Sequence, residues 1–427
     1  MFRVFANAWK TPDLRKKILF TIFVLVLYRL GSAIPVPYVD GAELAEQMDA
    51  ASGTLVGYFN MLSGYAFSQG TLFALGVSPY ITASIVMQLL SIAIPALERM
   101  SKSGPEGQEK ITKITRWVTV ILAVVTGYGY YSTIKNTYPG LVADGWFPAV
   151  VIVAALTAGS SLVMWVGERI DEKGIGNGIS MILFANIISR VPAMFGQMIY
   201  LIENGGASQL PWVLIALVMM LLIITLTVFF SNSERRLNVQ YAKRQVGRKM
   251  YGGMNTHLPI KVLMSGVMPI IFANAIVMMP ATLAMIFPSW ESGVTKWFSA
   301  SSQYPFYVIT MFVLIVAFAY FYLSISFNTV EVANNLKKNG GTILGYRPGK
   351  PTADYIKKVV NRITLMGSVF LSFMAIAPVL LSWTNQPALT NLVFGGTSII
   401  IVVSVALETA RQLESEITMR HYKGFLD

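Results

Sequence analysis

Residues able to perform covalent or acid-base chemistry are scarce in this sequence of 427 residues. It contains no cysteine and two histidines, His257 and His421, which excludes disulfides, thiol nucleophiles and cysteine-ligated metals. A Ser/His pair, an HExxH zinc motif or two facing aspartates, which intramembrane proteolysis needs, cannot be assembled inside a membrane segment. The run 174–178, Gly-Ile-Gly-Asn-Gly, misses the dinucleotide-binding spacing and follows no predicted strand, so we interpret it as a tight turn. We therefore predict that the chain is not an enzyme and uses no metal or cofactor.

The composition indicates a chain that lies mostly in lipid. Of its residues 54% are hydrophobic and 13% are charged, whereas soluble domains contain about 25% charged residues. Most of the chain must therefore face something other than water. Near-continuous apolar segments, most of them matching the roughly 17–25 residues that a spanning helix needs, occur at 18–35, 72–94, 117–134, 147–165, 176–189, 212–230, 262–287, 305–327, 363–383 and 388–407.

Charge decides whether the fifth of these segments counts as a span. It is short, and Arg190 and Pro192 are expected to end it. With ten spans and a cytosolic N-terminus, 29 of the 33 Lys and Arg residues fall in cytosolic segments. Omitting the fifth span would place the two most basic loops outside, against the positive-inside rule. We therefore predict a multi-pass protein of ten transmembrane helices with both termini in the cytosol.

The ten spans suggest an internal duplication. Five helices per half is an odd number, so a duplication would place the two halves in opposite orientations, as in many transport proteins. Residues 76–83 of the second span and 266–273 of the seventh are identical at five of eight positions. Chance similarity between two apolar, proline-containing helices explains this match equally well. We predict two halves, 1–210 and 211–427.

Two cytosolic loops, 232–261 and 328–362, carry +11 of the formal net charge of +12. In the first loop apolar and polar residues alternate over 237–241, which predicts a strand and a projecting hairpin. The second loop predicts a helix, a glycine turn and another helix from about Ala353. Basic loops can merely fix topology and contact anionic lipid. For two folded loops, a polyanionic or acidic partner is at least as well supported.

Polar groups inside the spans are few. No Asp or Glu lies within any span, so an ion- or proton-coupled carrier lacks its usual carboxylates. A secondary transporter for a small solute remains the alternative function, because it shares about ten helices and inverted repeats. Arg29 in the first span can reach the outer interface or a backbone carbonyl. Gln88 and Asn274, in spans two and seven, can hydrogen-bond across helices or serve as ordinary packing.

Seven short motifs, in order and spread over essentially the whole chain, resemble those of the bacterial SecY family. They are Ile34–Pro37, Ser78–Ile85, Gly174–Ser180, Tyr241–Arg244, Thr256–Pro259, Gly345–Gly349 and Gly395–Ser398. No motif is specific alone, but the set is. The resemblance implies an all-α membrane protein of ten transmembrane helices in two inverted five-helix halves, which form a clamshell with a central hourglass pore and a plug helix.

The function that the resemblance implies is that of a protein-conducting channel. Such a channel passes unfolded secretory proteins across the bacterial cytoplasmic membrane and releases membrane-protein helices sideways into lipid through a lateral gate. The implied partners are the small membrane subunits SecE and SecG, the SecA ATPase, the ribosome through its RNA, precursor polypeptides with signal sequences, and membrane lipids. No cofactor or metal is implied.

The resemblance also assigns roles to residues. The pore ring falls on six apolar positions, of which Leu183 departs from the commoner isoleucine but keeps its volume: Ile81, Ile85, Leu183, Ile187, Ile271 and Ile401. The plug is expected at about 58–69 and includes Tyr58, Phe59, Asn60, Met61, Leu62, Ser63, Gly64, Tyr65, Ala66 and Phe67. The lateral gate lies on spans two and seven, at Val86, Gln88, Asn274 and Met279. Contacts with SecA or the ribosome are expected at Arg235, Arg236, Lys243, Arg244 and Arg347.

Overall fold

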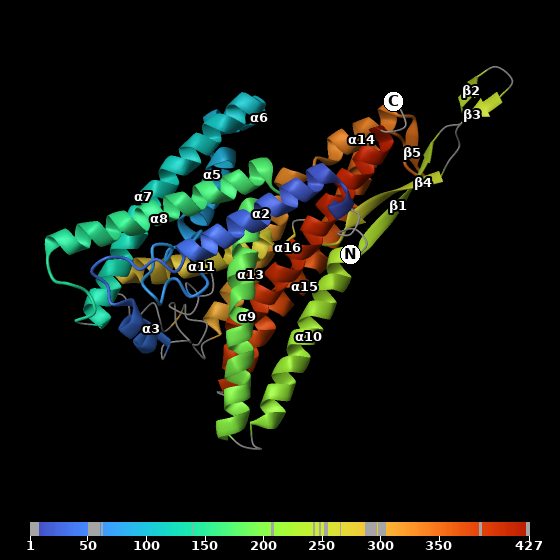
Figure 1. Cartoon of the computed structure of the whole chain (residues 1–427). Helices are drawn as coiled ribbons and strands as arrows, with labels where there is room; N and C mark the ends of the chain where they lie inside the picture. Colours follow the sequence, from blue (N-terminus) through green and yellow to red (C-terminus); the bar gives the residue numbers. More distant parts are fainter. Residues whose placement is uncertain are drawn as a thin grey trace.

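The computed structural model describes residues 8–49, 60, 63–138, 140–205, 209–241, 244–246, 249–251, 255–264, 266–286, 297, 305–383 and 387–423. A helix falls on each of the ten apolar segments (Figure 1). These ten helices are α2 (Pro12–Gly31), α5 (Ser78–Ala93), α7 (Pro105–Thr137), α8 (Trp146–Lys173), α9 (Gly178–Gly205), α10 (Leu210–Asn232), α11 (Met268–Ile286), α13 (Phe306–Ser326), α15 (Lys350–Ser382) and α16 (Pro387–Lys423). Among the described residues, six helices are long and apolar enough to cross a membrane by themselves. A seventh span arises if α5 and α6 (Pro95–Lys102), which meet at a bend of 103°, count as one.

Two span boundaries differ from the prediction. The expected end of span five at Arg190 and Pro192 is wrong, because α9 continues to Gly205 with Pro192 inside it. The guanidinium of Arg190 lies over the ring of Tyr65, 4.7 Å from its centroid, so this cation has a partner and does not force the helix to end. Span two is helical only from Ser78, since residues 72–77 form turns.

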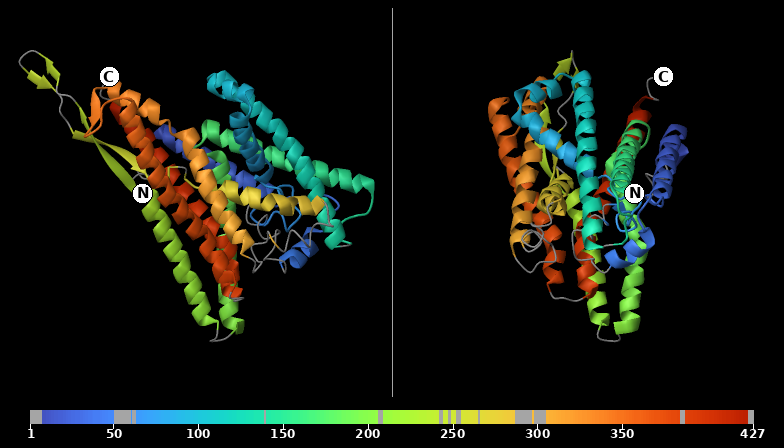
Figure 2. Two further views of the ribbon diagram at one scale, coloured as in Figure 1. Left: turned by 180° about the vertical axis from the view of Figure 1, so that it is seen from behind. Right: turned by 90° about the vertical axis from the view of Figure 1, so that its left-hand side faces the viewer.

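The helices pack in two groups that are continuous in sequence. Helices α5, α7, α8, α9 and α2 contact one another in the first half of the chain, and α11, α13, α15, α16 and α10 in the second. The groups meet along two seams, where α9 contacts α16 and α10 on one side and α11 contacts α5 and α7 on the other. Figures 1 and 2 show α10, α15 and α16 running side by side. The division at 210 and the inverted orientation of the halves remain predictions.

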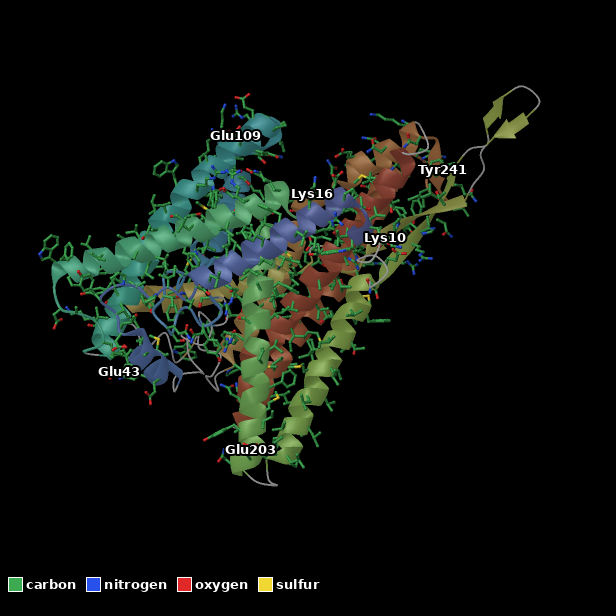
Figure 3. The ribbon with its side chains drawn as sticks, viewed as in Figure 1. Lys10, Lys16, Glu43, Glu109, Glu203 and Tyr241 are labelled. Atoms are coloured by element: carbon green, nitrogen blue, oxygen red, sulfur yellow. The ribbon has the colours of Figure 1, made fainter. Side chains whose placement is uncertain are left out.

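Polar elements mark the two ends of the molecule. Helix α6, helix α14 (Thr329–Lys338) and the strands lie on one side, and the acidic helix α3 (Gly41–Asp49) lies on the opposite side (Figure 1). Figure 3 shows Lys10, Lys16 and Glu109 toward the first side, with Glu43 and Glu203 toward the second. Large apolar side chains between these ends are exposed, such as Trp146 at 79%, as expected for a surface that faces lipid.

The two basic loops fold together rather than separately. Strand β1 (Glu234–Tyr241) pairs antiparallel with β4 (Asn255–Lys261), which confirms the predicted hairpin, and β2 (Arg244–Val246) pairs with β3 (Lys249–Tyr251) at its tip. Strand β5 (Gly341–Ile343), which the sequence did not predict, pairs with the other edge of β1 and gives the order β4-β1-β5. The second helix of loop 328–362 begins at Lys350, three residues before the expected Ala353.

A small apolar core holds this basic unit, formed by the sheet, α14 and the start of α15, together. It contains Leu237 and Val239 of β1, Leu336 of α14 and Ile343 of β5, packed against Ile356 of α15. Each of these side chains is at most 8% exposed. Because α15 continues into the membrane segment, the basic unit is fixed to a transmembrane helix rather than tethered by a flexible linker.

Candidate functional site

Four helices place the six predicted ring residues in two adjoining apolar clusters. Ile81, Ile85 and Leu183 belong to the large apolar cluster at the centre of the molecule. Ile187 and Ile401 form a second cluster with Val405. Ile271 of α11 packs against both clusters, so one continuous apolar layer joins α5, α9, α11 and α16. The other five ring residues are at most 9% exposed.

This burial distinguishes the ring residues from the many apolar residues that face outward. Leu183 is 1% exposed and Ile401 is 2% exposed, whereas Ile188, the next residue after Ile187 on α9, is 42% exposed. A branched apolar layer without fixed charge excludes water and yields to a passing side chain, because only dispersion contacts hold it together. The structure thus brings the predicted ring residues together, while their function as a seal stays a prediction.

Part of the predicted plug lies outside the described residues, namely Tyr58, Phe59, Met61 and Leu62. In the described part, Asn60 and Ser63 are helical and residues 64–70 form turns. The Asn60 side chain accepts a hydrogen bond of 2.8 Å from the backbone N–H of Ser68, and the Ser63 hydroxyl accepts one of 3.0 Å from that of Phe67. Ser63, Ala66 and Phe67 are each 1% exposed.

Side chains of three helices fix this turn from outside. Arg29 of α2 donates to the carbonyl of Gly64 at 3.3 Å, which confirms the backbone-carbonyl alternative for this arginine. Tyr130 of α7 donates to the carbonyl of Phe67 at 2.7 Å, and its ring meets the Phe67 ring edge-on. Tyr130 and Arg190 were not among the predicted site residues, because hydropathy does not show which helices surround a turn.

A buried polar contact ties α2 to α9 beside the ring. Asn186, fully buried, donates from Nδ2 to the Tyr28 hydroxyl at 2.9 Å, and Tyr28 stacks on Phe73 with ring centroids 5.3 Å apart. Asn186 is one residue before Ile187, so this bond fixes the rotation of α9 where it presents its ring residues. The sequence signal was available, since a polar Asn inside an apolar helix usually has a partner.

The predicted gate residues lie on two helices that touch. Helices α5 and α11 contact each other directly, with Val86 half-buried on α5 and Met279 41% exposed on α11. The side chain of Gln88 donates to Ser84 of its own helix at 3.5 Å, so this contact lies within α5 and not across the helices. Asn274 is buried on α11 at 5% exposure.

The turn 174–178 joins the start of α9 to three other helices. Asp171 of α8 accepts a hydrogen bond of 2.7 Å from the backbone N–H of Gly178, and Thr21 of α2 accepts one of 3.1 Å from that of Ile175. Gly176 has φ of +81°, and a Cβ there would lie 3.1 Å from the Thr409 hydroxyl of α16. This confirms the tight turn and gives its role, which is to place α9 between α8 and α16.

The position of Asp171 beside this turn shifts its pKa. Burial raises the pKa of Asp171, the hydrogen bond from Gly178 lowers it in part, and the charge of Glu168 raises it further. Both carboxylates lie beyond the apolar part of α8, near its C-terminal end. Glu168 is itself paired with Arg116 of α7 at 2.8 Å.

Three of the five basic residues predicted for partner contact lie at the surface. Arg235, Arg236 and Arg347 are exposed, and Arg236 bonds Glu234 at 2.7 Å. Next to Arg347, Tyr346 stacks on Tyr355 with centroids 4.0 Å apart, and Thr352 donates to the Arg347 carbonyl at 2.8 Å. These contacts fix the backbone of the turn that carries Arg347. Arg244 lies in strand β2, and Lys243 lies outside the described residues.

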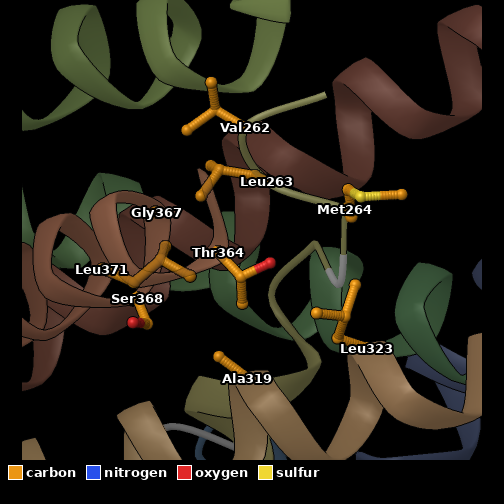
Figure 4. Close-up of a pocket in the computed structure, with 9 residues that line it drawn as sticks. All are labelled: Val262, Leu263, Met264, Ala319, Leu323, Thr364, Gly367, Ser368 and Leu371. Carbon is orange, nitrogen blue, oxygen red and sulfur yellow. The ribbon is translucent and has the colours of Figure 1, made fainter. Parts of the chain in front are cut away.

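A small pocket lies apart from all these residues (Figure 4). It is lined by nine residues of the β4–α11 connection, α13 and α15: Val262, Leu263, Met264, Ala319, Leu323, Thr364, Gly367, Ser368 and Leu371. None of the nine is charged, and Ser368 donates to the Leu365 carbonyl of its own helix. Among the described residues, no group of three or more His, Cys, Asp or Glu could hold a metal ion.

Comparison with known proteins identifies the family. The SecY family model matches residues 71–410. The protein translocase subunit SecY of Streptomyces coelicolor is 44% identical over 442 residues, which cover all of both chains. A relationship this close and complete supports a protein translocase over a small-solute transporter.

Solved structures agree with this assignment at the level of fold. A structure described as a protein-conducting channel matches with a TM-score of 0.66 at 21% identity, covering 94% of this chain and 92% of the other. A canine channel of the endoplasmic reticulum, solved in a ribosome–channel complex, matches with a TM-score of 0.63 at 20% identity and the same coverage. Given the family match and the full-length relative, this chain belongs to the SecY family of protein translocase subunits, which are channels and not enzymes.

Proposed function

We propose that this chain forms the channel of a protein translocase in the bacterial cytoplasmic membrane, with both termini in the cytosol, and that six side chains form its seal. The observation that carries the seal is the continuous apolar layer joined through Ile271, to which α5, α9, α11 and α16 all contribute. The positive-inside distribution of Lys and Arg supports the orientation.

The physical need for a channel follows from the cost of crossing lipid. Each Lys, Arg or Asp at the bilayer centre costs about 2.5–3.5 kcal/mol on translocon-insertion scales, so an unfolded chain with several charges needs a polar path. At rest this path must hold back ions. The ring Ile81, Ile85, Leu183, Ile187, Ile271 and Ile401 serves as the water-excluding constriction, and residues 58–69 cover it as the plug.

Helices α5 and α11 act as the lateral gate. They touch each other, and each has a proline in its first turn, Pro79 and Pro269, where the missing N–H removes no helical hydrogen bond and the proline favours the start of the helix at that residue. A signal helix that enters between Val86 and Met279 can then partition sideways into lipid. No covalent chemistry is required of this subunit.

The cytosolic unit of the sheet, α14 and the start of α15 binds the partner that drives translocation. Its exposed Arg235, Arg236 and Arg347 suit the phosphates of ribosomal RNA or the carboxylates of the SecA ATPase. The likeness to a channel solved in a ribosome–channel complex supports the ribosome as one such partner. SecE and SecG complete the assembly by covering exposed apolar faces in the membrane.

Reconstitution tests this function. The full chain is placed in vesicles with SecE and SecG, and a protease-protection assay follows a precursor after SecA and ATP are added. We expect protected precursor only with a functional signal sequence. If solute, but no precursor, enters these vesicles, the chain is a carrier and not a channel for proteins.

A further inference from the structure

The turn within the predicted plug is held by two arginines that come from different helices. Arg29 of α2 donates to the Gly64 carbonyl at 3.3 Å, and the guanidinium of Arg190 of α9 lies over the Tyr65 ring at 4.7 Å from its centroid. The two contacts hold consecutive residues of one turn. They therefore act on the same short piece of chain from two sides.

The backbone conformation and small size of Gly64 allow this contact. Its φ of +65° lies in the left-handed region, which a residue with a side chain rarely adopts. A Cβ at this position would lie 2.6 Å from Arg29 Nη1 and 3.1 Å from Asn186 Oδ1. Only glycine lets the backbone approach both side chains this closely.

Tyr65 adopts the same conformation without being glycine. Its φ is +74°, one of two positive values among the described non-glycine residues. Such a residue persists only where the surroundings stabilise it. The contact between the Tyr65 ring and Arg190 supplies that stabilisation, so loss of either side chain favours release of the turn.

The partners of the two cations are neutral. Within the part of the chain that the structure describes, the ion pairs include neither Arg29 nor Arg190. Each guanidinium instead meets a carbonyl or a ring. Contacts of this kind break more readily than a buried ion pair, which suits a segment that must leave and return.

The residues of α9 that contact the plug turn lie beside its ring residues. Leu183 and Ile187 are one helical turn apart, and Asn186 and Arg190 are one turn apart beside them. Leu183 and Ile187 lie in the apolar layer, whereas Asn186 and Arg190 face α2 and the plug turn. A displacement of α9 during opening therefore moves both the ring and the contacts with the plug turn.

We propose that Arg29 and Arg190 are positioning residues that form a latch on the plug turn and hold the channel closed. This latch rests on the proposed function, because it assumes that residues 58–69 are the plug. Opening releases Gly64 and Tyr65 and leaves two guanidiniums at the emptied site. The return of Tyr65 to the cation re-forms the closed state.

The test measures resting leak in vesicles that contain the full chain with its membrane subunits. Arg190→Met keeps the aliphatic stem and removes the charge, and Tyr65→Leu removes the ring. Each is expected to raise the open-to-closed ratio by about 2- to 30-fold, the range of an arginine–aromatic contact. The double variant should leak no more than the leakier single variant, because both remove one contact.

Two variants serve as matched controls. Tyr65→Phe keeps the ring and should stay closed like the wild type. Arg169→Met removes a similar cation, whose guanidinium lies 5.4 Å from the Trp165 ring on α8, and should leave the leak unchanged. Since Arg190→Met removes a charge from a membrane helix, it adds no insertion cost. The latch is wrong if Arg190→Met leaks no more than the wild type. It is also wrong if the fold-increase in leak of the double variant equals the product of the two single increases.

Failure of the latch is distinguishable from failure of the proposed function. The wild-type vesicles are assayed in parallel for signal-dependent precursor entry, and Ile401→Asn is assayed for leak. If precursor enters wild-type vesicles and Ile401→Asn raises the leak while Arg190→Met does not, the proposed channel function is supported and the latch is wrong. If wild-type vesicles admit no precursor, the channel itself is wrong, and the latch falls with it.

Discussion

Val239 of strand β1 pairs with Ile343 of strand β5, although the two residues belong to different basic loops. This pairing joins the loops into one sheet, and both side chains are at most 5% exposed in its core. Arg235 and Arg236 of β1 are thereby joined through the sheet to the loop that carries Arg347. A partner that docks there meets one rigid surface.

Ile343→Ala should loosen both loops at once. Truncating a buried isoleucine costs about 2–5 kcal/mol, which is expected to exceed the local stability of a three-stranded sheet. Hydrogen exchange of the β1 amides should therefore become faster, although β1 itself is unchanged. Leu344→Ala, at a neighbouring residue that is 64% exposed, is the control and should have no effect. Unchanged exchange in Ile343→Ala would show that β5 does not support β1.

Arg347→Glu should abolish SecA-driven translocation while insertion into the membrane stays normal. The residue is exposed on a turn whose backbone is fixed by Thr352, so the charge reversal changes the docking surface and not the fold. Precursor entry into vesicles measures the effect. Lys350→Glu reverses a neighbouring exposed cation and should retain most of the activity. Equal losses in both variants would mean that only net charge matters.

Cysteines at Val86 and Met279 should cross-link readily, because α5 and α11 touch and the natural chain has no cysteine to compete. Locking this pair should block export, which precursor assays with and without reductant measure. A cysteine at Leu222 of α10, which is 43% exposed, replaces Met279 in the control and should not link to position 86. No link in the resting protein, with both thiols accessible, contradicts the gate.

Ile401→Asn should make the resting channel conduct ions. The residue is 2% exposed, so the amide is held within the apolar layer and can hydrate it. Ile401→Leu keeps volume and polarity and should stay closed, because volume-conserving swaps cost least. Planar-bilayer recordings compare the two. A residue that faced lipid would instead give reduced insertion and no added conductance, and equal, wild-type-like leaks from both folded variants would remove Ile401 from the ring.

Asp171→Ala should destabilise the start of α9, since it removes the acceptor for the Gly178 N–H. Loss of such a cap costs about 0.5–2 kcal/mol, which thermal unfolding in detergent measures at neutral pH. Asp171→Asn keeps an oxygen acceptor and should be at least as stable as the wild type there. Comparing the two variants separates the contribution of the hydrogen bond to stability from that of the charge.

The stability difference between the wild type and Asp171→Asn should depend on pH, with a definite sign. Burial raises the pKa of Asp171 above its ordinary value, so the folded protein binds this proton more readily than the unfolded chain. The wild type therefore gains stability from this group as the pH falls through the raised pKa, and loses it as the pH rises. Any advantage of Asp171→Asn should shrink on acidification. An advantage that grows on acidification would contradict the raised pKa.

The sequence alone predicted which segments span the membrane and how they are oriented, and a helix of the structure falls on each of those segments. Each apolar run is a local property, because lipid accepts a helix for its own composition, and the Lys and Arg counts of the loops favour one orientation for all spans together. The hairpin of β1 and β4 was likewise local, since its alternation of apolar and polar residues lies in a single strand. The end of α9 was misjudged because Arg190 has its partner in a distant turn.

Only the tertiary structure decided which apolar residues face one another. Ile188 and Ile187 have the same hydropathy, yet Ile188 is 42% exposed and Ile187 is 7% exposed. Hydropathy does not distinguish the two positions, because lipid and protein interior are equally apolar to a side chain. The pairing of β5 with β1 and the contact of Arg190 with Tyr65 likewise join residues more than 100 positions apart. Hydropathy and spacing describe one segment at a time, whereas these contacts depend on how several segments pack together.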